Sequence, residues 1–408
     1  MLTNDDLKEL AELQQLKELI LDFPVTDEGV GHLTGLTNLT SLSIKQGRVT
    51  DAGLRQISKL RNLDYLWIVG DFTDSGVASL AELELLQSLQ IGSAHMTEAG
   101  LRSLQQKLAA LQFVQNIGPP ASIEQQTAEE FERPASAIER NRDAKEFARL
   151  ADANVLITFA NPEAPLTKRL FKLHLDYGGD LSHSVNNDYR TIAIPTVGPK
   201  RDQAAVLAKE LGVAVPKGEI PLIVAEAADG KVLGTLTGPD LVTKEDEIAE
   251  AALLAFVKQH GPPRLDGRKL FDDALAQAKR ENKRLLIDET AVWCGPCHML
   301  AAFLDKNRAV WEKDYLWIKM DPRWPHAAEI MRSLRGEASG GYPWFAILDA
   351  DGKVLATSNK PDGDNIGFPS EPDSVDHFLK MLKSTALRMT DEDFARLKKA
   401  FESSNRGM

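Results

Sequence analysis

The stretch LLIDETAVWCGPCHMLAAFL, residues 285–304, decides the interpretation of the second half of the chain. Its apolar start predicts a buried strand, and the apolar residues after the motif recur at helical spacing. Cys294 and Cys297 therefore lie where a strand passes into a helix. They are the only two cysteines of the sequence, and the short loop between them makes a poor structural staple. The pair is expected to be reactive or metal-binding.

The residue types of this motif suit thiol–disulfide exchange. A thiolate is the nucleophile, so the first cysteine needs a lowered pKa. A helix N-terminus supplies positive partial charge at Cys294, and Cys297 is one turn away, where it can release a mixed disulfide. Three alternatives stay open: haem attachment through the C-x-x-C-H pattern, zinc binding with His298 or His326, and a redox-inert remnant.

The motif and its setting resemble the thioredoxin family over about residues 264–386. The resemblance implies a thioredoxin fold, a buried Asp288 that accepts a proton from Cys297, and a cis-proline at Pro343. Residues expected to bind substrate are Trp293, Gly295, Pro296, Tyr342 and Pro343. The Gly-Pro dipeptide resembles the reducing members, which favours a reductase.

Two positions depart from the thioredoxin pattern. Trp317 stands where the family often has a lysine near the aspartate, and Glu289 stands at a normally apolar position beside Asp288. Both departures concern the surroundings of the expected proton acceptor.

An earlier segment, residues 136–260, follows the same order of helix, strand, loop and Pro-strand hairpin. A shift of 130 residues places Ala164 on Cys294 and Thr158 on Asp288. The sequence therefore predicts two tandem domains of one fold, the first without its cysteines. That first domain is either a structural spacer or a docking module for substrates or partners.

The N-terminal part is repetitive. A Thr-Asp/Glu-x-Gly-Val/Leu pattern begins at Thr26, Thr50, Thr73 and Thr97, at spacings of 24, 23 and 24, each time after L-x-x-L-x-(L/I). This resembles the leucine-rich repeat family over about residues 1–117, which implies a short curved solenoid. On its concave face, Tyr65 and Trp67 are expected either to bind a partner or to pack against the chain's own next domain.

Composition restricts the class of protein. With 408 residues, 43% hydrophobic and 26% charged, the chain is expected to form two to four globular domains. A net charge of −12 argues against nucleic-acid and anionic-membrane partners. The polar start lacks the layout of a signal peptide, so the expected location is cytoplasmic, or exported if a signal was trimmed. No cofactor and no metal are expected.

The expected fold class is multidomain α/β, a leucine-rich repeat solenoid followed by two tandem thioredoxin-like α/β domains. The expected parts are a repeat domain at 1–117, a linker at 118–135, a cysteine-free thioredoxin-like domain at 136–260, a thioredoxin domain at 264–386 and a C-terminal helix at 387–408. The expected function is a thiol–disulfide oxidoreductase, a reductase of protein disulfides whose other domains recognise a substrate or partner. The alternative is an interaction scaffold with a redox-sensing dithiol.

Overall fold

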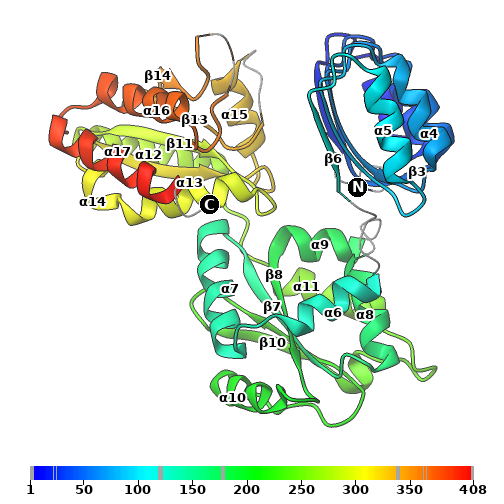
Figure 1. The fold of residues 1–408 in the computed structure, drawn as a ribbon. Helices are drawn as coiled ribbons and strands as arrows, with labels where there is room; N and C mark the ends of the chain where they lie inside the picture. Colours follow the sequence, from blue (N-terminus) through cyan, green and yellow to red (C-terminus); the bar gives the residue numbers. More distant parts are fainter. Residues whose placement is uncertain are drawn as a thin grey trace. The chain divides into compact units, whose positions relative to one another are not determined.

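The computed structural model describes residues 4–21, 23, 25–117, 123–175, 180–336, 341–361, 363 and 365–405. Its contacts divide the chain into two units, Met1–Arg133 with Thr167–His183, and Pro134–Leu166 with Ser184–Met408. Figure 1 labels many of their helices and strands. The first unit holds a six-stranded sheet, and the second holds two four-stranded sheets. The chain is therefore a multidomain α/β protein.

In the first unit, each repeat contributes one strand to a parallel sheet of order β1-β3-β4-β5-β6, with β2 also paired to β3. The strands are β1 Glu18–Leu21, β2 Val25–Thr26, β3 Ser41–Val49, β4 Tyr65–Gly70, β5 Ser88–Gly92 and β6 Phe113–Asn116. The helices are α1 Leu7–Leu10, α2 Asp27–Leu33, α3 Asp51–Ile57, α4 Asp74–Ser79, η1 Leu80–Glu82, α5 Glu98–Lys107 and α6 Ile123–Glu132. The strand leucines Leu42, Leu66 and Leu89 are in register and fully buried, so one continuous core runs through the repeats.

Hydrogen bonds between successive repeats explain the Thr-Asp-x-Gly pattern. The Asp51 carboxylate accepts from the backbone N–H of Thr73 at 2.7 Å and from its hydroxyl at 2.8 Å. Gly76 follows because a Cβ at its position would run into that carboxylate. The same two bonds join Asp27 to Thr50 and Asp74 to Thr97. The repeats that begin at Thr50, Thr73 and Thr97 are thus each joined to the aspartate of the repeat before them.

The structure contains one more repeat than the pattern predicts. Asn4 takes the place of the aspartate: its Nδ2 donates to the Thr26 hydroxyl at 2.9 Å, and its Oδ1 accepts from the Thr26 N–H at 3.2 Å. Leu7, in α1, is only 1% exposed and belongs to the same core. The repeat core therefore begins before Leu16, the first leucine of the L-x-x-L-x-(L/I) pattern.

The two sheets of the second unit have the same strand order and the same strand directions. In each, the strand that comes first in the chain is central, parallel to the second and antiparallel to the third, which pairs with the fourth. One sheet comprises β7 Asn154–Ala160, β8 Tyr189–Pro195, β9 Leu222–Glu226 and β10 Val232–Leu236. The other comprises β11 Arg284–Glu289, β12 Tyr315–Met320, β13 Trp344–Leu348 and β14 Val354–Thr357.

The opening elements of the two sheets keep the 130-residue offset. Helix α7 is Ala137–Ala151 and α12 is Gly267–Glu281, and each ends at a residue in the left-handed region, Asp152 or Asn282. The strands β7 and β11 and the next helices, α8 Pro165–Leu175 and α13 Gly295–Lys306, start at the same offset. Short polar residues tolerate the left-handed region. Each segment can therefore turn sharply from its helix into its strand.

The remaining helices are α9 Asp180–Asp188, α10 Arg201–Leu211, η2 Gly238–Asp240, α11 Glu250–Gln259, α14 Arg308–Trp311, α15 Ala327–Arg335, α16 Pro372–Thr385 and α17 Asp391–Asn405. Helices α13, α16 and α17 cover one face of the second sheet, and α12 and α15 cover the other. In α17, Phe401 is fully buried and stacks on Phe303 of α13, with ring centroids 3.7 Å apart. The C-terminal helix thus supports the helix that begins at the cysteine motif.

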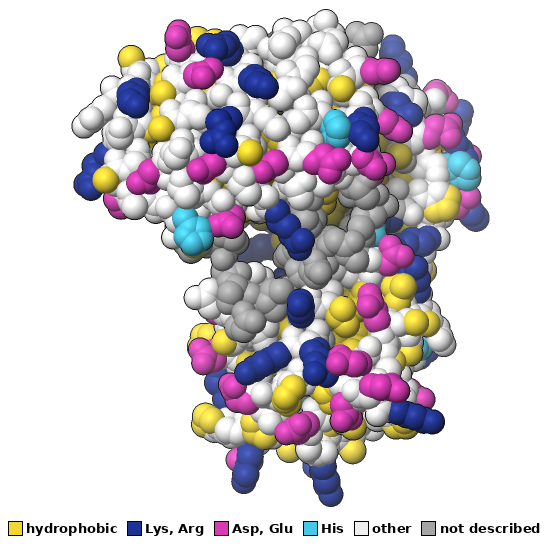
Figure 2. Space-filling model, turned by 90° about the vertical axis from the view of Figure 1, so that its right-hand side faces the viewer, with side chains coloured by type: hydrophobic (Ala, Val, Ile, Leu, Met, Phe, Trp, Pro, Cys, Tyr) yellow, Lys and Arg dark blue, Asp and Glu magenta, His cyan; other side chains and the backbone are white. Residues whose placement is uncertain are grey.

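None of the described helices combines the length and apolarity needed to cross a membrane. On the face drawn in Figure 2, acidic and basic side chains are interspersed. Residues 118–122, the start of the predicted linker, lie outside the described residues, and residues 123–132 of that linker form α6.

Candidate functional site

The cysteine pair lies at the N-terminus of α13, directly after the central strand β11 and a short turn. Cys294 is the N-cap residue, and its Sγ accepts a hydrogen bond from the Cys297 N–H at 3.1 Å. The two cysteines form a disulfide, with their Cα atoms 5.3 Å apart. The unpaired N–H groups of a helix N-terminus stabilise negative charge, so this position favours a thiolate at Cys294.

The predicted substrate-binding residues surround this disulfide. Cys294 and Cys297 are 3% and 0% exposed, whereas Trp293 is 57% exposed, and Gly295 and Pro296 are also exposed. Tyr342 packs against the apolar cluster that contains both cysteines. Its ring meets that of Trp293 edge-on, with centroids 5.4 Å apart.

Pro343 follows Tyr342 through a cis peptide bond and leads into β13. Asn365, in the segment after β14, donates from Nδ2 to the carbonyl of Gly341 at 2.8 Å and to that of Pro343 at 3.0 Å. This residue was not among the predicted site residues. It fastens a second segment to the cis-proline turn.

Asp288 is 1% exposed in β11 and accepts a hydrogen bond from Trp317 Nε1 at 2.5 Å. Burial raises the pKa of this carboxyl to about 7, although the Trp317 N–H and the positive charge of Lys319 act in the opposite direction. Trp317, which replaces the lysine of the family pattern, therefore contacts the aspartate directly as a neutral donor. A carboxyl with a pKa near 7 can both accept and give up a proton at neutral pH.

Glu289 is paired rather than isolated. Its Oε2 lies 2.5 Å from Arg335 Nη2, and its Oε1 accepts from the Tyr342 hydroxyl at 3.4 Å. Burial, and then the negative charge of Glu289, raises the pKa of Tyr342 to about 12. Tyr342 therefore remains a protonated donor beside the disulfide.

Residues of the segment 136–260 contact the chain on both sides of the cysteine motif, at Val292 and at His298. Phe147 of α7 meets the His298 ring edge-on at 4.3 Å. Val292, two residues before Cys294, lies in one hydrophobic cluster with Ile157 and Phe159 of β7. Burial, with the charges of Lys319 and Arg190, lowers the pKa of His298 to about 4, so His298 is neutral at physiological pH.

The corresponding positions of the earlier segment carry no thiol. Ala164 stands before α8 where Cys294 stands before α13, and Thr158 occupies the place of Asp288. Both are buried, at 2% and 3% exposure. Neither side chain offers a group for disulfide exchange.

In the repeat unit, Tyr65 and Trp67 lie on β4 and are half-buried. Their register neighbours are the small or polar residues Ser41 and Ser43 on β3, and Ser88 and Gln90 on β5. Phe113 on β6 continues the register row of Tyr65 and is 47% exposed, and Ile20 on β1 continues that of Trp67 and is 53% exposed. The sheet face opposite the leucine core therefore carries apolar and aromatic side chains among small polar ones.

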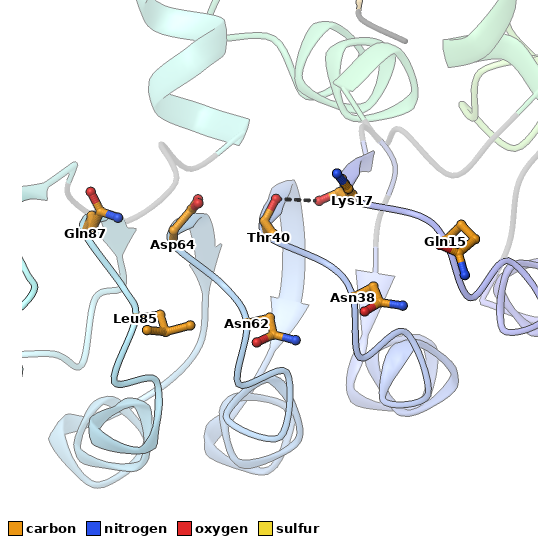
Figure 3. A pocket seen from close by; sticks show the side chains of 8 residues that line it. All are labelled: Gln15, Lys17, Asn38, Thr40, Asn62, Asp64, Leu85 and Gln87. Carbon is orange, nitrogen blue, oxygen red and sulfur yellow. Dashed lines mark hydrogen bonds between the residues drawn. The ribbon is translucent and has the colours of Figure 1, made fainter. Parts of the chain in front are cut away.

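A polar hollow of about 400 Å³ lies where the chain enters the strands of this unit (Figure 3). It is lined by Gln15, Lys17, Asn38, Thr40, Asn62, Asp64, Leu85 and Gln87. Asn38 and Asn62 donate to carbonyls of the preceding turns at 2.7 and 2.6 Å, and Thr40 donates to the Lys17 carbonyl at 3.1 Å. These polar groups join one repeat to the next, so they serve the fold.

Comparisons with known proteins find a thioredoxin-like region that includes Cys294 and Cys297. A family model described as thioredoxin-like matches residues 268–350. The H-type thioredoxin of Chlamydomonas reinhardtii is 33% identical over 57 residues, which cover 14% of this chain and 50% of that relative. The match therefore spans half the length of the curated relative.

Two solved structures are also similar. An internalin of Listeria monocytogenes is 21% identical, with a TM-score of 0.23, over 28% of this chain and 33% of that one. A disulphide isomerase of Xylella fastidiosa is 23% identical, with a TM-score of 0.22, over 34% of this chain and 92% of that one. The family model identifies residues 268–350, which contain Cys294 and Cys297, as a thioredoxin-like domain.

Proposed function

We propose that this chain is a thiol–disulfide oxidoreductase that reduces protein disulfides through Cys294 and Cys297. The observation that carries the proposal is the pairing of these cysteines at the N-terminus of α13, with the Cys297 N–H directed at Cys294 Sγ. That N–H and the helix N-terminus favour the thiolate, which is the attacking form.

In the reduced protein, the Cys294 thiolate attacks a substrate disulfide, which forms a mixed disulfide and releases one substrate thiolate. Asp288 then accepts the proton of Cys297, and the Cys297 thiolate attacks Cys294 Sγ. The second substrate thiolate leaves, and the two electrons that the substrate gains are those lost when the Cys294–Cys297 disulfide forms. A pKa of about 7 suits Asp288 to this transfer.

The substrate segment lies, in this proposal, against Trp293, Gly295, Pro296, Tyr342 and Pro343. The exposure of Trp293 and its edge contact with Tyr342 support such a rim beside the buried cysteines. Aromatic side chains contribute large contact areas at binding surfaces.

The other parts are proposed to recognise protein partners. Residues 1–117 are proposed as a leucine-rich repeat solenoid, which the period, the parallel sheet and the Thr–Asp bonds support. Its exposed face, with Tyr65 and Trp67, would bind a protein. Residues 136–260 are proposed as a second thioredoxin-like domain, which the shared strand order and the 130-residue offset support.

The proposal is tested by trapping. A C297S variant retains the nucleophile but cannot release the mixed disulfide, so it should accumulate partners joined to Cys294 that dithiothreitol releases. The matched control is the C294S/C297S double variant, which should trap nothing. If C297S behaves like the double variant, the chain is not an exchange enzyme, and a scaffold with a redox-sensing dithiol becomes the better description.

The reduction potential of the pair tests the direction of electron flow. A cytoplasmic reductase should equilibrate with glutathione near the thioredoxin value of about −270 mV. A value of about −180 to −120 mV, as in isomerases and oxidases, would instead place the chain in an oxidising compartment.

A further inference from the structure

One lysine of the thioredoxin-like domain is held by the end of a helix in the preceding segment. Lys319 of β12 donates from Nζ to the Leu150 carbonyl at 2.9 Å and forms an ion pair with Asp152. Leu150 lies in the last turn of α7, and Asp152 is its C-cap. Because the C-terminus of a helix carries negative partial charge, α7 offers a cation two favourable contacts at once.

The same lysine is next to the proposed proton acceptor. Lys319 and Asp288 are register partners on the parallel strands β12 and β11. The Lys319 ammonium lies 5.9 Å from the centre of the Trp317 ring, whose Nε1 donates to Asp288. Only 16% of the Lys319 side chain is exposed, so water screens its charge weakly at this site.

We propose that Lys319 and Asp152 act as a pair of positioning residues for Asp288, through which residues 136–260 adjust the proton transfer at the disulfide. The inference rests on the proposed function, because it assigns a role to that site's proton acceptor. It gives the cysteine-free segment a part in the chemistry, in addition to its proposed binding role.

The two members of the pair act on Asp288 in opposite directions. The Lys319 ammonium favours the ionised carboxylate, and the Asp152 carboxylate opposes that effect, directly and by neutralising the lysine. Other charged and titratable groups near this pair include His298 at the start of α13, whose pKa is lowered by burial and by the charges of Lys319 and Arg190 of β8. Arg323 donates from Nη2 to the Asp152 carbonyl at 3.3 Å and is itself paired with Asp321. Glu289, the neighbour of Asp288 on β11, is paired with Arg335.

The test is a pH titration of the Trp317 indole N–H resonance in the oxidised full-length protein, where the cysteines do not titrate. This group donates to Asp288, so its chemical shift follows the ionisation of that carboxyl. W317F assigns the resonance, and D288N should abolish the inflection. K319M should move the midpoint up and D152N should move it down, each by about one pH unit.

The substitutions are chosen to keep the fold. Asparagine has the shape of aspartate and tolerates the left-handed conformation that residue 152 adopts. K319R, which keeps the charge, should give a midpoint between that of K319M and that of the wild type. A structural role alone would not shift the midpoint in opposite directions for the two partners.

Opposite shifts would support the proposal. Shifts in the same direction, or no shift in either variant, would overturn it. Failure of the proposed function looks different: the midpoints would still move apart, but neither D288N nor the paired variants would alter the pH profile of mixed-disulfide release.

Discussion

Replacing Asp288 by asparagine should change how the stability of the thioredoxin-like domain depends on pH. The pKa of this carboxyl is about 7 in the folded protein, against an ordinary value of 3.8. Folding therefore buries a neutral acid without an ionisation cost below pH 4. Between about pH 4 and 7 the unfolded chain loses the proton first, so the wild type is progressively destabilised, and above pH 7 the difference is constant.

The magnitude follows from the two pKa values. Each unit of difference corresponds to about 1.4 kcal/mol, and linkage between the two values gives a loss of about 2.5 kcal/mol in the wild type from pH 5 to pH 8. Asparagine does not titrate, so D288N lacks this loss. Any constant packing effect of the substitution cancels when the two pH values are compared.

Hydrogen exchange measures this effect in the correct part of the chain. Peptides from β11, β12 and β13 report the opening of their own sheet, which avoids treating the whole chain as two-state. Both proteins are kept oxidised. The protection of D288N relative to the wild type should increase by roughly a hundredfold between pH 5 and pH 8.

Peptides from the repeat unit serve as the internal control, and their ratio of D288N protection to wild-type protection should not change with pH. If the ratio for β11 peptides is also independent of pH, the reasoning is refuted, because Asp288 would then have an ordinary pKa. A ratio that falls with pH would mean that the buried carboxylate is stabilised by its partners rather than penalised by burial.

Three further substitutions test other contacts. Asp51→Ala removes both bonds to Thr73 and should lower the protection of α4 by about 1–2 kcal/mol, measured by hydrogen exchange, whereas Asp51→Asn should retain part of it. Phe401→Ala should lower the protection of β13 by about 3–5 kcal/mol in hydrogen exchange, and Phe401→Leu by less. Equal small effects would mean that α17 is not part of the core. Glu289→Gln should lower the pKa of Tyr342 from about 12 towards its ordinary 10, seen as tyrosinate absorbance that Tyr342→Phe removes; an unchanged pKa would show that burial alone raises it.

The parts of this fold that local sequence determines could be predicted. The repeat period follows from residues spaced 23 or 24 apart, and the strand leucines Leu42, Leu66 and Leu89 are buried as the pattern predicts. The pattern does not identify the first repeat, because Asp6 stands at its glycine position. Glycine is needed at the later positions because a Cβ there would run into the polar side chain of the preceding repeat, as at Gly53 and Gly76.

In the candidate site, too, the local features could be predicted and the long-range contacts could not. A strand followed by a helix with cysteines at its start is a local arrangement, and the thioredoxin resemblance implied that Trp317 lies near Asp288. The contact between Lys319 and Leu150 joins positions 169 residues apart. No pattern in either segment indicates that contact, because it depends on how α7 packs against α13.

The Thr–Asp bonds have a consequence for how such a chain can change in length. The repeats that begin at Thr50, Thr73 and Thr97 each receive a carboxylate from the repeat before them, with a glycine that makes room for it. The joints between repeats are therefore interchangeable, and a duplicated stretch of 23 or 24 residues would find matching groups on both sides. Recombination within the gene could lengthen or shorten the array without new compensating substitutions, so the size of its exposed face can vary independently of the redox chemistry.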